Sequence, residues 1–235
     1  MKCNTSHSCE FCTARPLSVF NSLPADQLQQ LSSAKSCMVF KKGQYVFAEN
    51  SYPMGLYCIN AGKIKLFITG HDGKEQILRF AKEGNIIGYR ALLCDEPYHC
   101  SAIVIEDTSL CFIPKNTFLS LLEQNAQLSL SLIKLLGSNL KEAEQHIVSM
   151  SQKNVRERVA EALLFFKAVY GMESDQKTIQ IKLSREEIAD YVGTSTETAI
   201  RFLSELNNDK IIATEGKKIR IIDLARLQRT AGIDF

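Results

Sequence analysis

The chain has 235 residues, of which 45% are hydrophobic and 23% are charged, and its net charge is +2. This composition is typical of a globular protein with one large domain or two modest ones. A charge so close to zero does not indicate nucleic acid by itself, so any basic surface must be local. No run approaches the ~18 apolar residues of a membrane-spanning helix. Because the N-terminus also lacks the apolar core of an export signal, we expect a cytoplasmic protein with no membrane partner.

The sequence predicts an α+β protein in four consecutive stretches. These are a cysteine-containing leader (1–14), a β-roll sensory domain (15–120), a long dimerisation helix (121–151) and a winged helix-turn-helix DNA-binding domain (152–235). The eight cysteines are scattered. Without an export signal, such spacing favours reduced thiols or metal ligands over a disulfide framework.

Short β-type runs separated by turn signals fill the second stretch. The runs lie at 38–40, 45–47, 56–59, 63–69, 75–80, 101–106 and 109–113. Many short strands at this spacing predict an antiparallel roll or barrel, similar to a double-stranded jelly roll.

A long helical stretch from about 115 to 150 carries an apolar seam with alternating steps of three and four. The seam consists of Ile133, Leu136, Leu140, Ala143, Ile147 and Met150, about two and a half heptads. Such a stripe more commonly packs on the protein's own core. Because the opposite face is polar and the helix joins the β-domain to a DNA-reading domain, we favour parallel self-association. Residues 151–154 are the expected hinge, and a further helix is expected at 155–170.

The segment Leu183–Arg201 has the pattern of two helices joined by a glycine-containing turn. Ser184 and Glu187 form a capping box for the first helix, and Gly193 ends it. Ser195 caps the second helix, whose apolar positions are Ala199, Phe202, Leu203 and Leu206. This is the helix-turn-helix pattern, in which the second helix enters the major groove of DNA.

The opposite face of the second helix favours DNA reading over a merely structural helical hairpin. Thr196, Glu197, Ile200 and Arg201 project from it, with Thr198 beside them. Arginine is the usual bidentate partner of guanine, and glutamate accepts from the cytosine amino group. Serine and threonine suit phosphate oxygens.

A β-hairpin is expected directly after the second helix. Its strands are Ile211–Thr214 and Ile219–Ile222, and its turn is Glu215–Gly216. A hairpin in this place is a wing. Its basic residues Lys217, Lys218 and Arg220 suit DNA phosphates, which add affinity without sequence information.

From the roll onward the chain resembles the Crp–Fnr family of bacterial transcription regulators. The resemblance rests on the glycine pattern of the roll (41–67), on KEGNIIG (82–88) and SAIVIEDTSLCFIP (101–114), on SQKNVRERVAEALL (151–164) and on the helix-turn-helix with its wing. It implies a homodimer that binds double-stranded DNA and contacts RNA polymerase.

The resemblance also assigns roles within the DNA-binding domain. Glu197 and Arg201 match base-reading positions for a half-site with a TGA core, and Thr196 matches a variable specificity position. Ser184, Arg185, Ser195 and Thr198 match phosphate contacts, and Gly216 marks the wing tip, followed by Lys217 and Lys218.

The effector pocket departs from the family pattern. Members that bind cyclic AMP carry Gly-Glu and Arg-Ser-Ala where this chain has Gly88–Tyr89 and Cys100–Ser101–Ala102. Both charged partners of the nucleotide are therefore missing, which disfavours cyclic AMP. Arg90 and Arg79 do not match by position. The sequence leaves open whether another effector binds in the pocket formed by Gly88, Tyr89, Arg90, Cys100 and Ser101.

The cysteines suggest a second kind of sensor, with the cofactor left unknown. Cys3, Cys9 and Cys12 in the leader and Cys111 on a roll strand resemble the ligand set of the oxygen-sensing branch, whose iron–sulfur cluster needs four thiolates. The match is partial, because that branch has a tail cysteine closer to the roll. One alternative is that the cysteines bind zinc or carry out other thiol chemistry. Another is that they bind no metal and are small residues of the core.

Two other functions have less support. None of the four histidines lies in a recognisable haem-ligand pair. A ligand-binding module or an enzyme with a non-DNA role is the alternative to a regulator. However, the sequence has neither a phosphate-binding glycine loop nor a nucleophile motif, so we expect no enzymatic activity.

Overall fold

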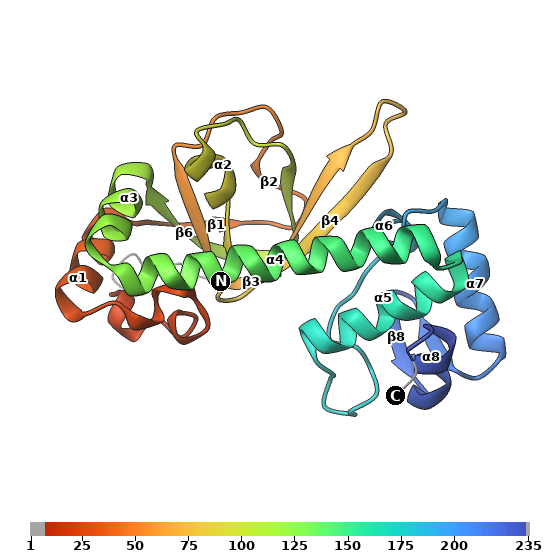
Figure 1. Ribbon diagram of the computed structural model, residues 1–235. Coiled ribbons are helices and arrows are strands. Elements are labelled where there is room, and N and C mark those ends of the chain that lie inside the picture. Colours follow the sequence, from red (N-terminus) through yellow and green to blue (C-terminus); the bar gives the residue numbers. More distant parts are fainter. Residues whose placement is uncertain (1–7, 234–235) are drawn as a thin grey trace. The chain divides into compact units, whose positions relative to one another are not determined.

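The structure is a computed structural model that describes residues 8–233. The chain forms two compact units that divide between Lys141 and Glu142, within helix α4 (Ala126–Gln152) (Figure 1). The first unit contains an antiparallel sheet, and the second contains mainly helices with a short hairpin. The predicted α+β class is confirmed.

Six antiparallel strands build the roll of the first unit. They are β1 (Ser36–Phe40), β2 (Tyr45–Phe47), β3 (Gly55–Thr69), β4 (Glu75–Lys82), β5 (Ile86–Ile87) and β6 (Ser101–Pro114). Their order is β1-β6-β3-β4, with β2 paired to β6 and β5 paired to β3. The predicted antiparallel roll is confirmed, although two of its strands are longer than expected.

The runs at 56–59 and 63–69, expected as separate strands, form the single strand β3. In the same way, 101–106 and 109–113 form β6, and β3 pairs with β6 along most of its length. The register shifts between Ile59 and Ile64, around Gly62, whose φ is +98°. The glycine therefore marks a bulge and not a chain reversal, because an extra residue in one strand bends the ladder without ending it.

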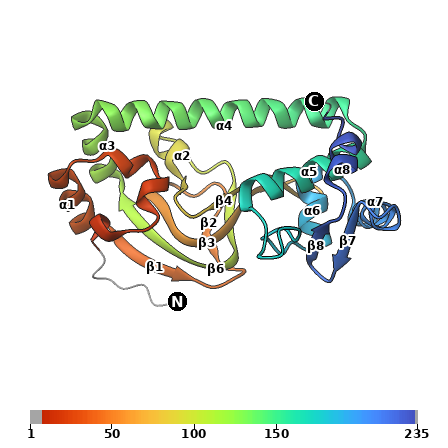
Figure 2. The same ribbon diagram turned by 90° about the horizontal axis from the view of Figure 1, so that it is seen from below.

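Helices cover one end of the roll. α1 (Ala25–Ala34) and α3 (Lys115–Gln124) lie together there in both views (Figures 1 and 2). Their buried side chains form one core with short 3₁₀ turns and the start of α4; it includes Phe20, Leu31, Phe118, Leu121, Leu128 and Leu132. A second apolar cluster fills the interior of the roll; it includes Ile59, Ile64, Leu66, Ala102, Val104 and Leu110.

The helical stretch expected from 115 to 150 is interrupted at Asn125. This residue has an extended backbone (φ −133°, ψ 95°) between α3 and α4. Its side-chain oxygen accepts a hydrogen bond from the Leu128 N–H at 2.9 Å. An asparagine that competes for backbone donors in this way favours a helix start over a helix interior. The long helix therefore begins at Ala126, five residues after the predicted start at 121.

The second unit begins in the last turns of α4. It continues with α5 (Val155–Tyr170), α6 (Arg185–Val192), α7 (Thr196–Asn208), β7 (Ile212–Glu215), β8 (Lys218–Ile221) and α8 (Leu224–Thr230). α5 starts with a capping box between Asn154 and Glu157. The core of this unit includes Leu163, Phe166, Ile188, Leu203, Leu206 and Leu227. None of the helices between residues 8 and 233 is long and apolar enough to cross a membrane.

Candidate nucleic-acid interface

The first helix of the pair, α6, starts and stops where the sequence predicts. The Ser184 hydroxyl accepts from the Glu187 N–H at 3.1 Å, and the Glu187 carboxylate accepts from the Ser184 N–H at 2.6 Å. Gly193 ends the helix in the left-handed region with φ +71°, a conformation that glycine adopts at little cost. Local sequence alone therefore sets both ends of α6.

The second helix, α7, starts at Thr196 behind its cap Ser195, whose hydroxyl accepts from the Thr198 N–H at 3.2 Å. The apolar positions Ala199, Leu203 and Leu206 are buried, as predicted, while Phe202 is half-buried. The Arg201 guanidinium lies 4.7 Å from the centre of the Phe202 ring. This cation–π contact supports the side chain of Arg201 while leaving its hydrogen-bond donors on the exposed face.

The exposed face of α7 carries the residues that the sequence nominated as base readers. Glu197 and Arg201 are exposed, and Thr196 is half-buried. The backbone N–H of Glu197 and the Ser195 hydroxyl hold the pKa of the Glu197 carboxyl below its ordinary value. The first turns of α7 therefore present an anionic acceptor and a cationic donor side by side.

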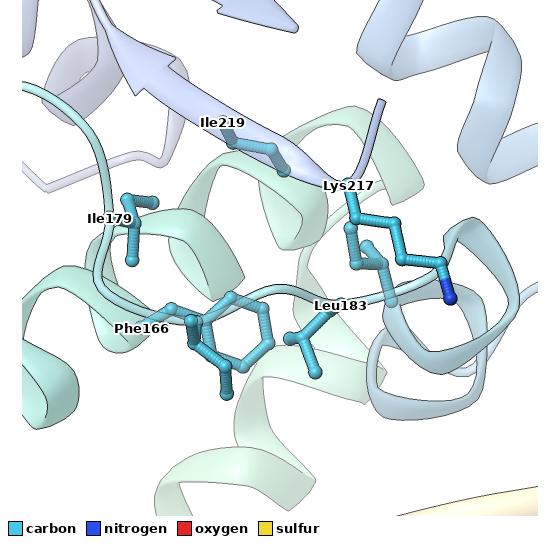
Figure 3. Close-up of a pocket in the computed structure, with 7 residues that line it drawn as sticks. Phe166, Ile179, Leu183, Lys217 and Ile219 are labelled. Carbon is cyan, nitrogen blue, oxygen red and sulfur yellow. The ribbon is translucent and has the colours of Figure 1, made fainter. Parts of the chain in front are cut away.

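The wing is a hairpin of β7 and β8 that turns at Gly216 and Lys217, one residue later than expected. Lys217 is exposed at its tip, and in Figure 3 it lies at the edge of a cluster that includes the apolar side chains of Phe166, Leu183 and Ile219, with its ammonium pointing away from them. Lys218 instead pairs with Glu173 at 2.8 Å, and this carboxylate raises the pKa of the lysine. Within the described part of the chain, Lys218 forms an ion pair and Lys217 does not.

Arg185 is the first residue of α6 and is half-buried. Its Nη1 atom is buried and has no hydrogen-bond partner within residues 8–233. A buried charged donor without a partner is costly. Burial also lowers the pKa of the guanidinium. The side chain of Arg185 therefore gains free energy from any anion that reaches it, as a phosphate would at a helix N-terminus.

Arg158 on α5 organises the helix-turn-helix; it lies in the segment 151–164 that carries the family resemblance, but no role was predicted for it. Its Nε donates to the carbonyl of Val192 at 3.0 Å, its Nη2 to that of Gly193 at 3.3 Å and its Nη1 to that of Lys153 at 2.8 Å. The first two carbonyls form the turn between α6 and α7, and the third lies just beyond the end of α4. One guanidinium thus ties the DNA-reading turn to the end of the long helix.

The roll residues nominated for an effector lie beside closely packed aromatic rings. A Cβ at Gly88 would come within 3.2 Å of the Tyr98 ring, and Tyr98 stacks on Phe47 with ring centres 3.9 Å apart. Tyr89 and Cys100 replace the family's charged partners, and both are buried. Burial raises the pKa of the Cys100 thiol to about 11, although Arg79 and Arg90 oppose it. Because a thiol carries no positive charge in either protonation state, Cys100 cannot replace the arginine that neutralises a cyclic phosphate.

Tyr89 connects the nominated pocket to α4. Its hydroxyl accepts a hydrogen bond from the side-chain amide of Asn139, and its ring lies 5.8 Å from the Arg79 guanidinium. Arg90 is partly exposed and lies 3.5 Å from Glu96. The Ser101 hydroxyl is occupied in the roll, where it accepts from the Glu49 N–H at 3.0 Å.

Three of the nominated cysteines gather around one lysine. The Lys35 ammonium is 3.8 Å from the Cys111 sulfur. Burial would lower the pKa of Lys35, but the thiols of Cys111, Cys9 and Cys12 together raise it. Burial raises the pKa of the Cys111 thiol against the effect of Lys35. Cys3 lies outside the described residues, within which no three side chains form a metal-binding group.

The nominated seam of α4 is largely uncovered. Ile133, Leu140 and Ile147 are 63%, 61% and 67% exposed, Leu136 and Ala143 are also exposed, and Met150 is half-buried. The core instead takes Leu128 and Leu132 from another face of the helix. The stripe therefore does not pack on the protein's own core, which was the commoner alternative.

An antiparallel β-roll together with a winged helix-turn-helix defines a DNA-binding transcription regulator. Two family descriptions match consecutive parts of the chain, the cyclic nucleotide-binding domain over residues 37–125 and the Crp-like helix-turn-helix domain over residues 157–230. The chain belongs to the Crp–Fnr family of transcription regulators.

Relatives resemble the chain over nearly its whole length. The transcriptional activator protein Anr of Pseudomonas protegens is 29% identical over 97% of this chain and 94% of its own. The fumarate and nitrate reduction regulatory protein of Vibrio cholerae is 27% identical over 96% of this chain and 90% of its own. The solved structure of FixK2 from Bradyrhizobium japonicum has a TM-score of 0.75 and 25% identity, covering 83% of this chain and 96% of its own.

Replacing Arg158 with lysine tests its role in the turn. An ammonium cannot span three carbonyls as the guanidinium fork does, so we expect the second unit to lose about 1–3 kcal/mol of stability and specific DNA binding to fall by about tenfold or more. Thermal unfolding and gel shifts measure the two effects. Arg229→Lys, at an exposed position of α8, is the matched control, and equal behaviour of the two variants would contradict the role.

Proposed function

We propose that this regulator acts as a homodimer that reads a TGA-containing dyad in duplex DNA and responds to a redox signal or a small effector. The observation that carries the proposal is the exposed face of α7, where Glu197 and Arg201 lie next to each other around a rigidly capped helix start. The N-terminal residues of a recognition helix are the ones that contact base edges.

The chemistry of this face suits a G·C pair within the half-site. Arg201 can donate two hydrogen bonds to the O6 and N7 of guanine, and the Glu197 carboxylate can accept from the N4 amino group of cytosine. Thr196 precedes Glu197 at the helix start and lies where it can contact a neighbouring base. These three residues are the proposed base readers.

A second set of residues is proposed to contact phosphates and to fix the register of the protein on the duplex. Arg185 contributes a guanidinium whose buried Nη1 has no hydrogen-bond partner within residues 8–233, and Lys217 contributes an ammonium at the tip of the wing. The set comprises Ser184, Arg185, Ser195, Thr198, Gly216, Lys217 and Lys218. Because Lys218 is paired with Glu173, we expect it to contribute less than Lys217.

Arg201→Ala and Lys217→Ala separate base reading from phosphate contact. Loss of Arg201 should cost about 1–3 kcal/mol and relax discrimination at one base pair of each half-site. Loss of Lys217 should weaken binding to all sequences similarly and flatten the salt dependence. Gel shifts at several salt concentrations, with a duplex selected from a random library and a scrambled duplex, measure both. Equal losses of Arg201→Ala on both duplexes would refute base reading, and selection of no dyad would refute the proposed function.

The proposed dimer uses the exposed stripe of α4. Its members Ile133, Leu136, Leu140, Ala143, Ile147 and Met150 repeat at heptad-like spacing, which suits a parallel two-stranded coiled coil. A two-fold axis would present two recognition helices to half-sites one helical turn apart. Dimerisation would bury apolar surface that a monomer leaves in water.

Leu140→Glu places a charge in this stripe, where Leu140 is 61% exposed. The monomer should fold unchanged, because the side chain is outside the core. The dimer should weaken about 100-fold or more, since two carboxylates would be buried without partners. Sedimentation equilibrium measures this change, with Lys141→Glu on the neighbouring polar face as the control. An unchanged dimer would rule out the stripe as the interface.

The proposed redox response is carried by Cys9, Cys12 and Cys111, which gather around Lys35. An iron–sulfur cluster needs four thiolates. The described residues offer three of the four nominated, and they are not spaced to hold a metal ion. We propose thiol oxidation as the form of redox control that these residues support. We also propose that the protein contacts RNA polymerase and is located in the cytoplasm.

Cys111→Ser tests the redox response. DNA affinity of the unaltered protein should differ by about tenfold or more between anaerobic and air-exposed samples, and the difference should disappear in Cys111→Ser. Cys94→Ser replaces an exposed free thiol at the end of helix α2 (Tyr89–Cys94) and should leave the difference intact. Iron and sulfide analysis of the anaerobic protein separates a cluster from thiol chemistry. No difference in the unaltered protein would leave a small effector as the proposed signal.

A further inference from the structure

α7 carries one large aliphatic side chain that the fold leaves uncovered. Ile200 is 45% exposed, whereas Leu203 and Leu206 of the same helix are at most 2% exposed. Ile200 is therefore outside the core of the second unit. An apolar side chain of this size on the surface proposed to face DNA needs an apolar partner to leave water.

The position of Ile200 on the helix restricts what this partner can be. Residues three and four apart are neighbours on a helix surface. Ile200 therefore lies next to Thr196 and Glu197, which are one turn closer to the start of α7. The Ser204 hydroxyl, one turn beyond Ile200, donates to the Ile200 carbonyl at 2.9 Å and is engaged within the helix. Ile200 is thus the side chain available to the base pair that follows the one read by Glu197.

We infer that Ile200 is a specificity-determining residue that contacts the C5-methyl group of a thymine in each half-site. This inference rests on the proposed base reading by α7. In the major groove, the thymine methyl is the apolar group that a base pair presents, while the other groups on the base edges are hydrogen-bond donors and acceptors. Isoleucine has neither donors nor acceptors, so facing any other base edge would leave a polar group without a partner.

The contact also determines which way the half-site is oriented on the recognition helix. Glu197 and Arg201 suit one G·C pair through hydrogen bonds, and Ile200 adds a preference for thymine over cytosine at the adjacent position. The discrimination comes from a methyl group on the DNA, so it is independent of charge and of salt concentration. This property separates it from the contacts of Lys217 and the other phosphate-binding residues.

Replacing thymine with deoxyuridine removes this methyl group and nothing else. In a duplex selected by the unaltered protein, each thymine of the half-site is replaced in turn, and Kd is measured by fluorescence anisotropy. At one position the replacement should weaken binding about fourfold, which corresponds to about 0.8 kcal/mol for one buried methyl group. Ile200→Ala should bind the thymine and deoxyuridine duplexes equally. The penalty in the unaltered protein should persist at low and high salt.

Ile222→Ala is the matched control, because Ile222 is 48% exposed and lies outside the recognition helix, just beyond β8. This variant should keep the full deoxyuridine penalty. The inference is overturned if the unaltered protein binds every deoxyuridine duplex as tightly as the thymine duplex, or if Ile200→Ala retains the penalty. A failure of the proposed function is distinguishable, because the unaltered protein would then select no sequence in the first step.

Discussion

The guanidinium of Arg158 is the contact on which the DNA-reading geometry depends. Three carbonyls, two from the turn between α6 and α7 and one from the residue after α4, converge on its donors. Carbonyls at the end of a helix have no partner within that helix, and a cation placed there also interacts favourably with the helix dipole. The capping bonds of Ser184 and Ser195 set where each helix begins, but Arg158 sets where the turn lies relative to the end of α4. A shift in the last turns of α4 would therefore reach the recognition helix directly.

The long helix α4 packs one apolar face on the core and exposes another. Leu128 and Leu132 complete the core of the first unit, while Ile133, Leu140 and Ile147 remain in water. A helix period of 3.6 residues lets a single apolar-rich sequence supply both faces without conflict. Asn139 adds a polar link from the same helix to Tyr89 of α2. A change around α2 therefore has a physical route, through this hydrogen bond, to the helix that carries the proposed dimer stripe.

The β-roll differs in character from the helix-turn-helix domain. Where family members that bind cyclic AMP carry a glutamate and an arginine, this chain buries Tyr89 and Cys100 among aromatic rings. On the side of the roll near Lys35, sulfur atoms gather from the leader and from β6. Thiols held near an ammonium in a poorly solvated setting are groups whose protonation and oxidation change the local charge.

Features whose signals lie within a few residues of one another could be predicted from the sequence. The capping box of Ser184 and Glu187, the helix end at Gly193 and the cap Ser195 were predicted correctly, because hydrogen bonds between near neighbours fix them. The other features depended on tertiary contacts. The pairing of β3 with β6 joined the runs at 56–59 and 63–69, expected as separate strands, through a bulge around Gly62, and Asn125 divided the predicted helix. The partners of Arg158 in the turn lie 34 and 35 residues away, and Glu173 lies 45 residues from Lys218. Such contacts depend on which surfaces the folded chain brings together, and spacing along the sequence carries no record of them.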